Sequence, residues 1–124
     1  LGAQVNAHTD KDHSAFHMFG LGADAPDFVR MLADIVRHGS FPADELEREK
    51  QVILQEIGSY EDAPDELIFD LFMEQGFPDT VLGRPILGTP DSVMALSEDS
   101  MRTFLARQYR APAMVVAAAG ARSR

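Results

Sequence analysis

The amino-acid sequence predicts an α+β fold in which an antiparallel-rich sheet is covered by a layer of helices. Two short extended stretches open the chain, amphipathic helical periodicity fills its middle, and a strand-like apolar run follows. The predicted order is β-β-α-α-α-α-α-β, with strands that must pair beneath the helices. The 124 residues are 45% apolar and 25% charged, which is typical of a globular domain that can bury a sizeable core.

The chain opens with two predicted strands, at residues 4–9 and 14–21, joined by a charged Asp-Lys-Asp turn. Phe16 and Met18 alternate with smaller or polar residues in the second stretch, which is typical of a strand with one buried face. Glycines and Pro26 then end the extended region and favour the start of a helix.

The first predicted helix spans residues 26–38, where apolar side chains recur at the spacing i, i+3, i+4, i+7 and i+8. These side chains belong to Phe28, Met31, Leu32, Ile35 and Val36. The spacing places them on one face of a helix. A basic last turn followed by glycine is typical of a helix C-terminus.

The same signals predict four more helices and a closing strand. Proline, or a capping serine or threonine, stands at or near the start of each helix. The predicted helices span residues 42–60, 64–75, 90–96 and 97–110, a loop covers residues 76–88, and a buried strand covers residues 114–119. The buried strand is expected because Met-Val-Val followed by three alanines is a continuous apolar run.

Composition excludes several classes of function. Eleven Lys and Arg residues against twenty Asp and Glu residues give a net charge of −9, which argues against a nucleic-acid partner. No apolar run is long enough to cross a membrane. The chain has no cysteine, which excludes disulfides, thiolate metal ligands and cysteine nucleophiles. Since no targeting signal is visible either, we expect a cytoplasmic location.

Two glutamates in the second predicted helix are the strongest candidates for a functional site. Glu49 and Glu56 are seven residues apart, so they project from nearly the same side of the helix. They flank an apolar stripe that includes Ile53 and Ile57, where a carboxylate needs a partner such as a metal ion or a histidine. Spacing alone favours a simpler interpretation, a charged helix edge in water to which Lys50 also belongs.

The four histidines give weaker signals. His13 and His17 are four residues apart, which suits a metal pair on a helix. Their segment is predicted to be extended, however, and there such positions lie about 13 Å apart. His38, at the end of a predicted helix, is explained by the helix dipole. The sequence contains neither a phosphate-binding glycine loop nor a serine nucleophile elbow.

Five segments occur in an order that is informative as a set. They are Val-Asn-Ala-His-Thr at 5–9, the helical run at 46–56, Glu-Asp-Ala-Pro at 61–64, the segment at 82–89, and Tyr-Arg-Ala-Pro-Ala-Met-Val-Val at 109–116. Together they resemble the N-terminal domain of the pitrilysin family of zinc metallopeptidases, to which insulinase and the mitochondrial processing peptidase belong. The resemblance covers nearly the whole chain.

The resemblance implies a role for each candidate residue. Family members hold zinc through an inverted His-x-x-Glu-His helix and a distant glutamate, which matches Glu56. Glu49 matches a second glutamate that supports the catalytic site from outside the metal's coordination sphere. Asn6 and Ala7 match a pair on an edge strand, to which substrate peptides add through backbone hydrogen bonds. A plain edge strand with a polar side chain is the alternative for this pair.

The His-x-x-Glu-His motif does not occur in these 124 residues. By family order it precedes Leu1, so we expect residues 1–124 to be a fragment of one pitrilysin-like N-terminal domain, truncated at both ends and inactive alone. In the intact zinc endopeptidase, a metal-activated water would hydrolyse peptides or unfolded segments. A second homologous domain or subunit would complete a closed chamber. The alternative is a non-catalytic partner subunit of the same family that serves assembly or peptide binding.

Overall fold

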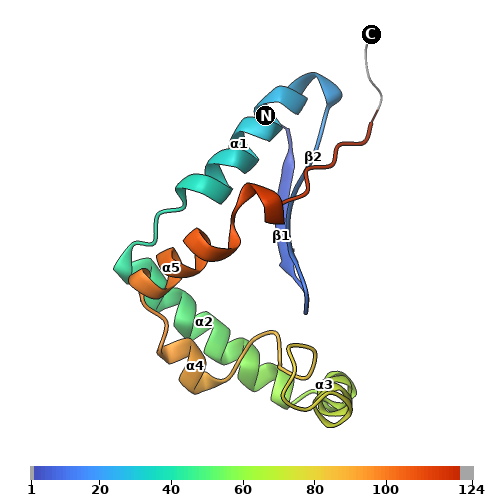
Figure 1. The fold of residues 1–124 in the computed structure, drawn as a ribbon, viewed down its shortest axis with the longest axis vertical. Helices are drawn as coiled ribbons and strands as arrows, with labels where there is room; N and C mark the ends of the chain where they lie inside the picture. The colour runs from blue at the N-terminus through green and yellow to red at the C-terminus, as the bar shows by residue number, and fades with distance from the viewer. Residues whose placement is uncertain (1, 121–124) are drawn as a thin grey trace. The chain divides into compact units, whose positions relative to one another are not determined.

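The computed structural model describes residues 2–120 and contains two strands followed by five α-helices in that range (Figure 1). The strands are β1 (Gln4–Thr9) and β2 (Ser14–Phe19), and the helices are α1 (Ala25–His38), α2 (Ala43–Glu61), α3 (Pro64–Gly76), α4 (Pro90–Met94) and α5 (Glu98–Gln108). Short 3-10 helices lie at Gly22–Asp24 and Ala111–Ala113. We expected the domain to be truncated at both ends of the chain. The residues at these ends, Leu1 and residues 121–124, lie outside the described residues.

Two compact units make up the chain. The first contains the two strands, α1 and the chain from residue 101 onward, and the second contains the hairpin turn at residues 9–13 together with residues 41–100. Helices α2, α3 and α4 therefore belong to the second unit. No helix within residues 2–120 combines the length and the apolar character needed to cross a membrane.

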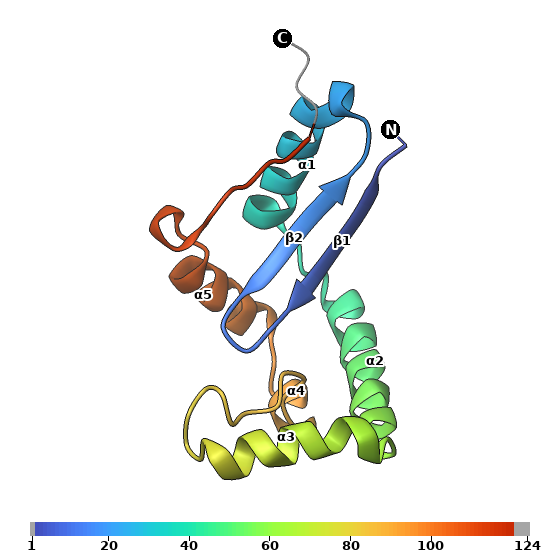
Figure 2. The ribbon, with the colours of Figure 1, turned by 90° about the vertical axis from the view of Figure 1, so that its right-hand side faces the viewer.

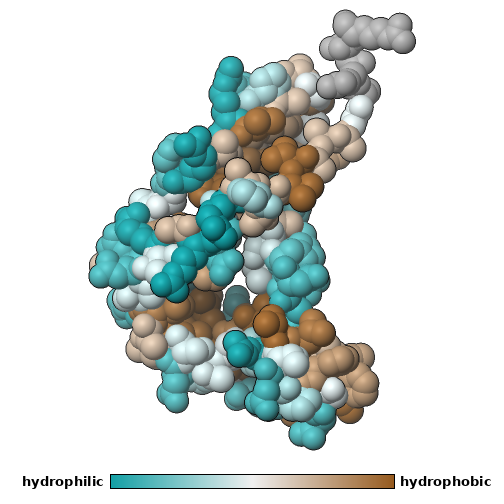
Figure 3. All heavy atoms as spheres, in the orientation of Figure 1, coloured by the Kyte–Doolittle hydropathy of each residue, from teal (hydrophilic) through white to brown (hydrophobic). Residues whose placement is uncertain are grey.

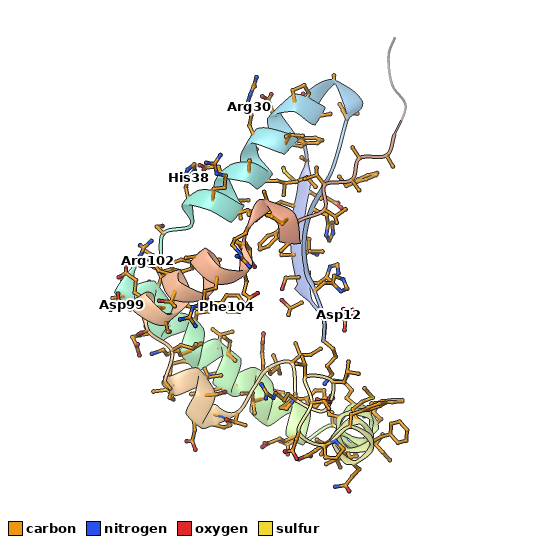
Figure 4. All side chains as sticks on the ribbon, viewed as in Figure 1. Asp12, Arg30, His38, Asp99, Arg102 and Phe104 are labelled. Atoms are coloured by element: carbon orange, nitrogen blue, oxygen red, sulfur yellow. The ribbon has the colours of Figure 1, made fainter. Side chains whose placement is uncertain are left out.

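In the first unit, β1 and β2 form a two-stranded antiparallel sheet and α1 packs against β2 (Figure 2). A side-chain carbon at Gly20 would lie 2.6 Å from the Phe28 ring, so any larger residue at this position would require that ring to move. Phe16 of β2 makes an edge contact with Tyr109, with ring centroids 6.3 Å apart. Arg30 and His38 project from the side of α1 that faces away from the sheet (Figure 4).

In the second unit, α2 packs against both α3 and α4. Ile57 of α2 and Val93 of α4 are 7% and 4% exposed and form its small apolar core. Thr89 begins α4 as a reciprocal cap, because its side chain accepts a bond from the Ser92 amide while the Ser92 hydroxyl accepts one from the Thr89 amide. The core and the cap together fix the α2–α4 pair.

The α+β fold class and all of the predicted helices are confirmed, with boundaries that differ by no more than two residues. Both N-terminal strands are confirmed as well, although β2 ends at Phe19 instead of residue 21. Their agreement with the sequence follows from strong local signals, namely apolar periodicity, proline at helix starts and glycine after helix ends.

The predicted buried strand at residues 114–119 is wrong. These residues carry no regular structure, and Val115 and Val116 are 94% and 87% exposed. Met114 does adopt an extended backbone, with φ −113° and ψ 141°. The apolar run therefore favours the extended conformation, but a strand also needs a neighbouring strand to pair its backbone groups, and within residues 2–120 the sheet contains only β1 and β2.

The core is smaller than the composition allows. Of the apolar side chains in the described range, only Ile57 and Val93 are buried, while many others lie at the surface of both units (Figure 3). Apolar side chains of α1 and α3 remain partly exposed, among them Ile35 at 44% and Phe69 at 71%. A chain of this composition thus leaves unusually extensive apolar surface in contact with water.

Candidate functional site

Helix α2 positions the two candidate glutamates, and both are exposed on its surface. The buried side of α2 is formed by Lys50 and Ile57, and Ile53 is half-buried between them. Glu49 precedes Lys50 and Glu56 precedes Ile57 by one residue, so each carboxylate lies about 100° around the helix from a buried position. The glutamates therefore flank the buried stripe, as the spacing predicts.

Glu56 borders an open cavity of about 610 Å³ within the second unit. The cavity is lined mainly by polar side chains of α2 and the first turn of α3, with Val52, Ala63 and Leu87 as apolar neighbours; the polar lining residues are Gln55, Glu56, Ser59, Tyr60 and Glu66. The Tyr60 hydroxyl donates a hydrogen bond of 2.9 Å to the Glu66 carbonyl, which ties α2 to α3 at the cavity edge. Glu56 thus lines a space that a ligand or a further protein group can enter.

The pKa of Tyr60 lies above its ordinary value. Partial screening of the phenol from water is the main cause, and the negative charges of Asp70 and Glu66 add to it. The phenol therefore remains a neutral hydrogen-bond donor at neutral pH. It shapes the cavity and does not serve as a base.

The structure does not bring Glu49 to this cavity. Seven residues of α-helix separate Glu49 from Glu56, which is a rise of about 10.5 Å. Two carboxylates that bind one metal ion lie far closer together than that. Within residues 2–120 no group of three His, Cys, Asp or Glu side chains could hold a metal ion, so the described residues do not form a three-ligand catalytic zinc centre by themselves.

Asn6 and Ala7 lie on β1, whose six residues are all exposed. The Asp10 amide donates a bond of 2.7 Å to the His13 carbonyl, and counting back from this pair places Asn6 opposite His17 and Ala7 opposite Phe16. In this register the backbone N–H and C=O of Ala7 point away from β2, toward the outer edge of the sheet. The Ala7 amide donates there to Oδ1 of Asn6 at 2.8 Å.

Two of the histidines are held by aspartates close by in sequence. Nδ1 of His38 lies 2.9 Å from Asp34 on α1, and Nδ1 of His13 lies 2.7 Å from Asp12 in the hairpin turn (Figure 4). The hydrogen bond between His13 and Asp12 raises the pKa of His13 and lowers the pKa of Asp12. His13 and His17 do not form a metal pair on a helix, because His17 lies on β2 and His13 in the turn before it.

Sequence comparison assigns the family. The family described as Insulinase (Peptidase family M16) matches residues 1–90 of the chain. The chain belongs to this family. The resemblance to the pitrilysin and insulinase peptidases is therefore confirmed, and it extends to the α2 helix that carries both glutamates.

Individual relatives of this M16 segment include proteins named as proteases and a protein named otherwise. It is 38% identical over 120 residues to an uncharacterized zinc protease of Mycobacterium tuberculosis, covering 97% of this chain and 27% of the relative. It is 36% identical over 120 residues to the uncharacterized zinc protease YmxG of Bacillus subtilis, covering 97% and 29%. It is also 35% identical over 120 residues to cytochrome b-c1 complex subunit 1 of Bos taurus, covering 97% and 25%.

A solved structure supports the fold. The crystal structure of a protein described as an M16-like peptidase, from Alicyclobacillus acidocaldarius, matches this chain with a TM-score of 0.77 at 29% identity. The match covers 84% of this chain and 24% of that protein. The M16 segment thus spans about a quarter of the length of the relatives that it matches.

The prediction that Lys50 belongs to a solvated helix face is wrong. Its side chain is buried, with Nζ 2.7 Å from Glu47 and 3.4 Å from the Met94 carbonyl at the end of α4. The signal was present in the sequence, because Lys50 continues the Leu46–Ile53 stripe at the spacing i+4 and i−3. The charge of Lys50 hid this register.

Lys11 makes long-range contacts that the sequence did not reveal. From the hairpin turn, its Nζ lies 3.1 Å from Oδ1 of Asp70 on α3 and 2.6 Å from the Arg84 carbonyl. These partners are 59 and 73 residues away in sequence, so no local pattern could indicate them.

Proposed function

We propose that this M16 segment is part of a zinc-dependent endopeptidase that hydrolyses peptides or unfolded segments. In the intact enzyme it supplies Glu56 as a zinc ligand and β1 as a strand to which substrate adds. The observation that carries the proposal is the exposed Glu56 carboxylate at an open polar cavity, in a chain of the insulinase family that is similar to named zinc proteases.

The donor set present fits one ligand of a zinc centre and not a whole centre. Catalytic zinc needs three protein ligands and an open position for water. Glu56 provides one oxygen donor of a suitable kind, and the other two ligands are expected from a His-x-x-Glu-His helix outside these 124 residues. No step of hydrolysis is therefore assigned to the segment itself, and we expect it to be inactive alone.

Glu49 is expected to act on the metal site indirectly. Glu49 lies too far along α2 from Glu56 for both carboxylates to bind the same ion. The role proposed for Glu49 is therefore to orient another group that itself binds zinc. The simple alternative, a solvated carboxylate on a helix edge, predicts no effect of its removal on zinc binding. The two interpretations can therefore be separated by one substitution.

The outer edge of β1 supports the role proposed for Asn6 and Ala7. Backbone groups of alternate residues, including those of Ala7, point to this edge and match those of an added strand. Oδ1 of Asn6 already accepts the bond of the Ala7 amide, so an incoming peptide carbonyl would take its place. Asn6 would thus protect the edge in the free protein and release it on binding.

A second homologous domain or subunit is the proposed partner. The exposed apolar side chains of α3 support it, because such a surface is costly to leave in water. They include Ile68, Phe69 and Phe72, which are 60%, 71% and 69% exposed. The cytoplasmic location stays a prediction that rests on the absence of cysteine.

A non-catalytic partner subunit of the same family is the second candidate function. It is favoured by the 35% identity to cytochrome b-c1 complex subunit 1, whose name describes a member of a complex and not a protease. Reading the coding sequence upstream of Leu1 separates the two candidates. An intact His-x-x-Glu-His there supports the peptidase, and its absence supports the subunit.

The peptidase proposal is tested by Glu56→Gln in the polypeptide that carries this segment together with the His-x-x-Glu-His helix. The amide keeps the shape but loses the anionic donor, so we expect zinc affinity to fall by far more than tenfold and proteolysis to be lost. Glu49→Gln should weaken zinc binding less, by about ten- to a hundredfold. Zinc content by mass spectrometry and peptide cleavage are the measurements.

Glu61→Gln is the matched control, since Glu61 is an exposed glutamate near the end of the same helix. It should leave zinc content and cleavage unchanged. Full zinc content in Glu56→Gln would refute the ligand role, and equal losses in all three variants would indicate a general effect on α2.

A further inference from the structure

We propose that His8 and His17 form a binding site for one divalent transition metal ion on the face of the β1–β2 hairpin opposite Phe16. The two imidazole rings lie beside each other across the strands, with centroids 5.9 Å apart and ring planes inclined by 58°. Both residues are exposed. The site is distinct from Glu56 and goes beyond the peptidase function, on which it does not depend.

The strand register explains why these two side chains meet. Asn6 lies opposite His17, so His8 is the diagonal neighbour of His17 on the same face of the hairpin. The other face carries Phe16, whose ring contacts Tyr109. The ring of Tyr109 therefore lies on one face of the hairpin, and the histidine pair lies on the opposite face.

The spacing of the rings suits a single ion. Imidazole nitrogen binds zinc at about 2.0–2.1 Å, which places the metal about 3.2 Å from each ring centroid. At a tetrahedral angle two such rings have centroids about 5.2 Å apart. The observed 5.9 Å is about 0.7 Å longer, and small side-chain rotations of exposed residues close that gap.

The chemistry of the pair selects the class of ion. Two neutral imidazoles suit Zn²⁺, Cu²⁺ or Ni²⁺, whereas Ca²⁺ and Mg²⁺ prefer oxygen ligands. Water would fill the remaining coordination positions, because residues 2–120 provide no group of three ligating side chains. An ion with open positions on this face could also accept a donor from a bound molecule.

Titration of the 124-residue chain with ZnSO₄, followed through the imidazole C–H signals by NMR, tests the site. We expect the ring signals of His8 and His17 to shift together and to saturate at one zinc ion per chain. The signals of His13 and His38, which hydrogen-bond to Asp12 and Asp34, should respond only at much higher zinc concentration.

His17→Ala should weaken zinc binding at least tenfold. His17→Phe keeps an aromatic ring on β2 and should weaken it equally, which covers the case in which the alanine variant disturbs the hairpin. His38→Ala is the matched control and should bind zinc like the parent chain. Parallel shifts of all four histidines, or parental affinity in His17→Phe, would overturn the proposal. MgSO₄ at the same concentrations should shift neither ring.

Discussion

The two units of the chain differ in how their side chains are held. The second unit contains the only side chains of residues 2–120 that are less than one tenth exposed, those of Lys50, Ile57 and Val93, together with long-range polar contacts made by Lys11 and Lys50. The first unit buries no side chain fully and relies on hairpin pairing, aromatic edge contacts and the half-covered face of α1. The rigid positions of the molecule are therefore concentrated around α2.

This difference matches the roles proposed for the two units. A metal ligand must be held within a fraction of an ångström, and Glu56 lies on the helix that packs against both α3 and α4. A strand that accepts a peptide must instead keep its backbone accessible, and β1 is exposed along its whole length. Tight packing and open edges thus occur where each proposed function needs them.

The largest effect that tests this comparison is expected from the small core of the second unit. Ile57→Ala removes buried methylene and methyl groups from the α2–α4 contact and should lower the free energy of unfolding by about 2–4 kcal/mol. Phe19→Ala, at a residue 77% exposed in the first unit, should change it by less than about 0.5 kcal/mol. Urea denaturation followed by circular dichroism measures both. Similar losses of unfolding free energy in the two variants would contradict the difference in packing between the two units.

Lys50 offers a test of intermediate size. Lys50→Ala removes a buried stem and the bonds to Glu47 and the Met94 carbonyl, and should cost about 1–3 kcal/mol. Arg48→Ala is the matched control, because its ion pair with Glu45 is solvated and should be worth at most about 1 kcal/mol. Lys50→Met should recover part of the loss, since it restores the apolar stem. Equal effects of the Lys50 and Arg48 alanine variants in urea denaturation would contradict the buried role.

The smallest effect concerns the hairpin turn. Asp12→Asn should lower the pKa of His13 toward its ordinary value, because the carboxylate that accepts the hydrogen bond of the imidazolium is lost. In the parent chain this ion pair exists only between the lowered pKa of Asp12 and the raised pKa of His13. The contribution of the ion pair to stability is therefore lost as the pH rises through the pKa of His13, and it is also lost as the pH falls through the pKa of Asp12.

The measurement is an NMR titration of the His13 ring. Asp10→Asn should lower the pKa of His13 by less, since the charge of Asp10 raises that pKa less than the hydrogen bond and the charge of Asp12 do. An unchanged His13 titration in Asp12→Asn would show that the turn does not hold the pair together in solution.

Local sequence signals were enough to predict the helices, because each element carries its own periodicity and end signals. The same signals failed at residues 114–119, where Met114 is extended but the strand has no partner in the described sheet. Pairing is a long-range property, and a run such as Met-Val-Val records only the preference for extended backbone. The contact of Lys11 with Asp70 was invisible for the same reason.

The candidate site was predictable in part. The heptad spacing of Glu49 and Glu56 and the register of the buried stripe follow from helix geometry, and the stripe also contained the signal for the burial of Lys50. The meeting of His8 and His17 could have been found by pairing the two strands across the turn. The zinc ligand role proposed for Glu56 could not be derived from spacing, because a lone carboxylate does not define a metal site.

The most direct test of the account is a crystal structure of the protein that carries this segment together with its His-x-x-Glu-His helix, with diffraction recorded at the zinc absorption edge. The account predicts an anomalous peak about 2.0–2.2 Å from a carboxylate oxygen of Glu56. A bound zinc ion whose ligands do not include Glu56 would contradict it.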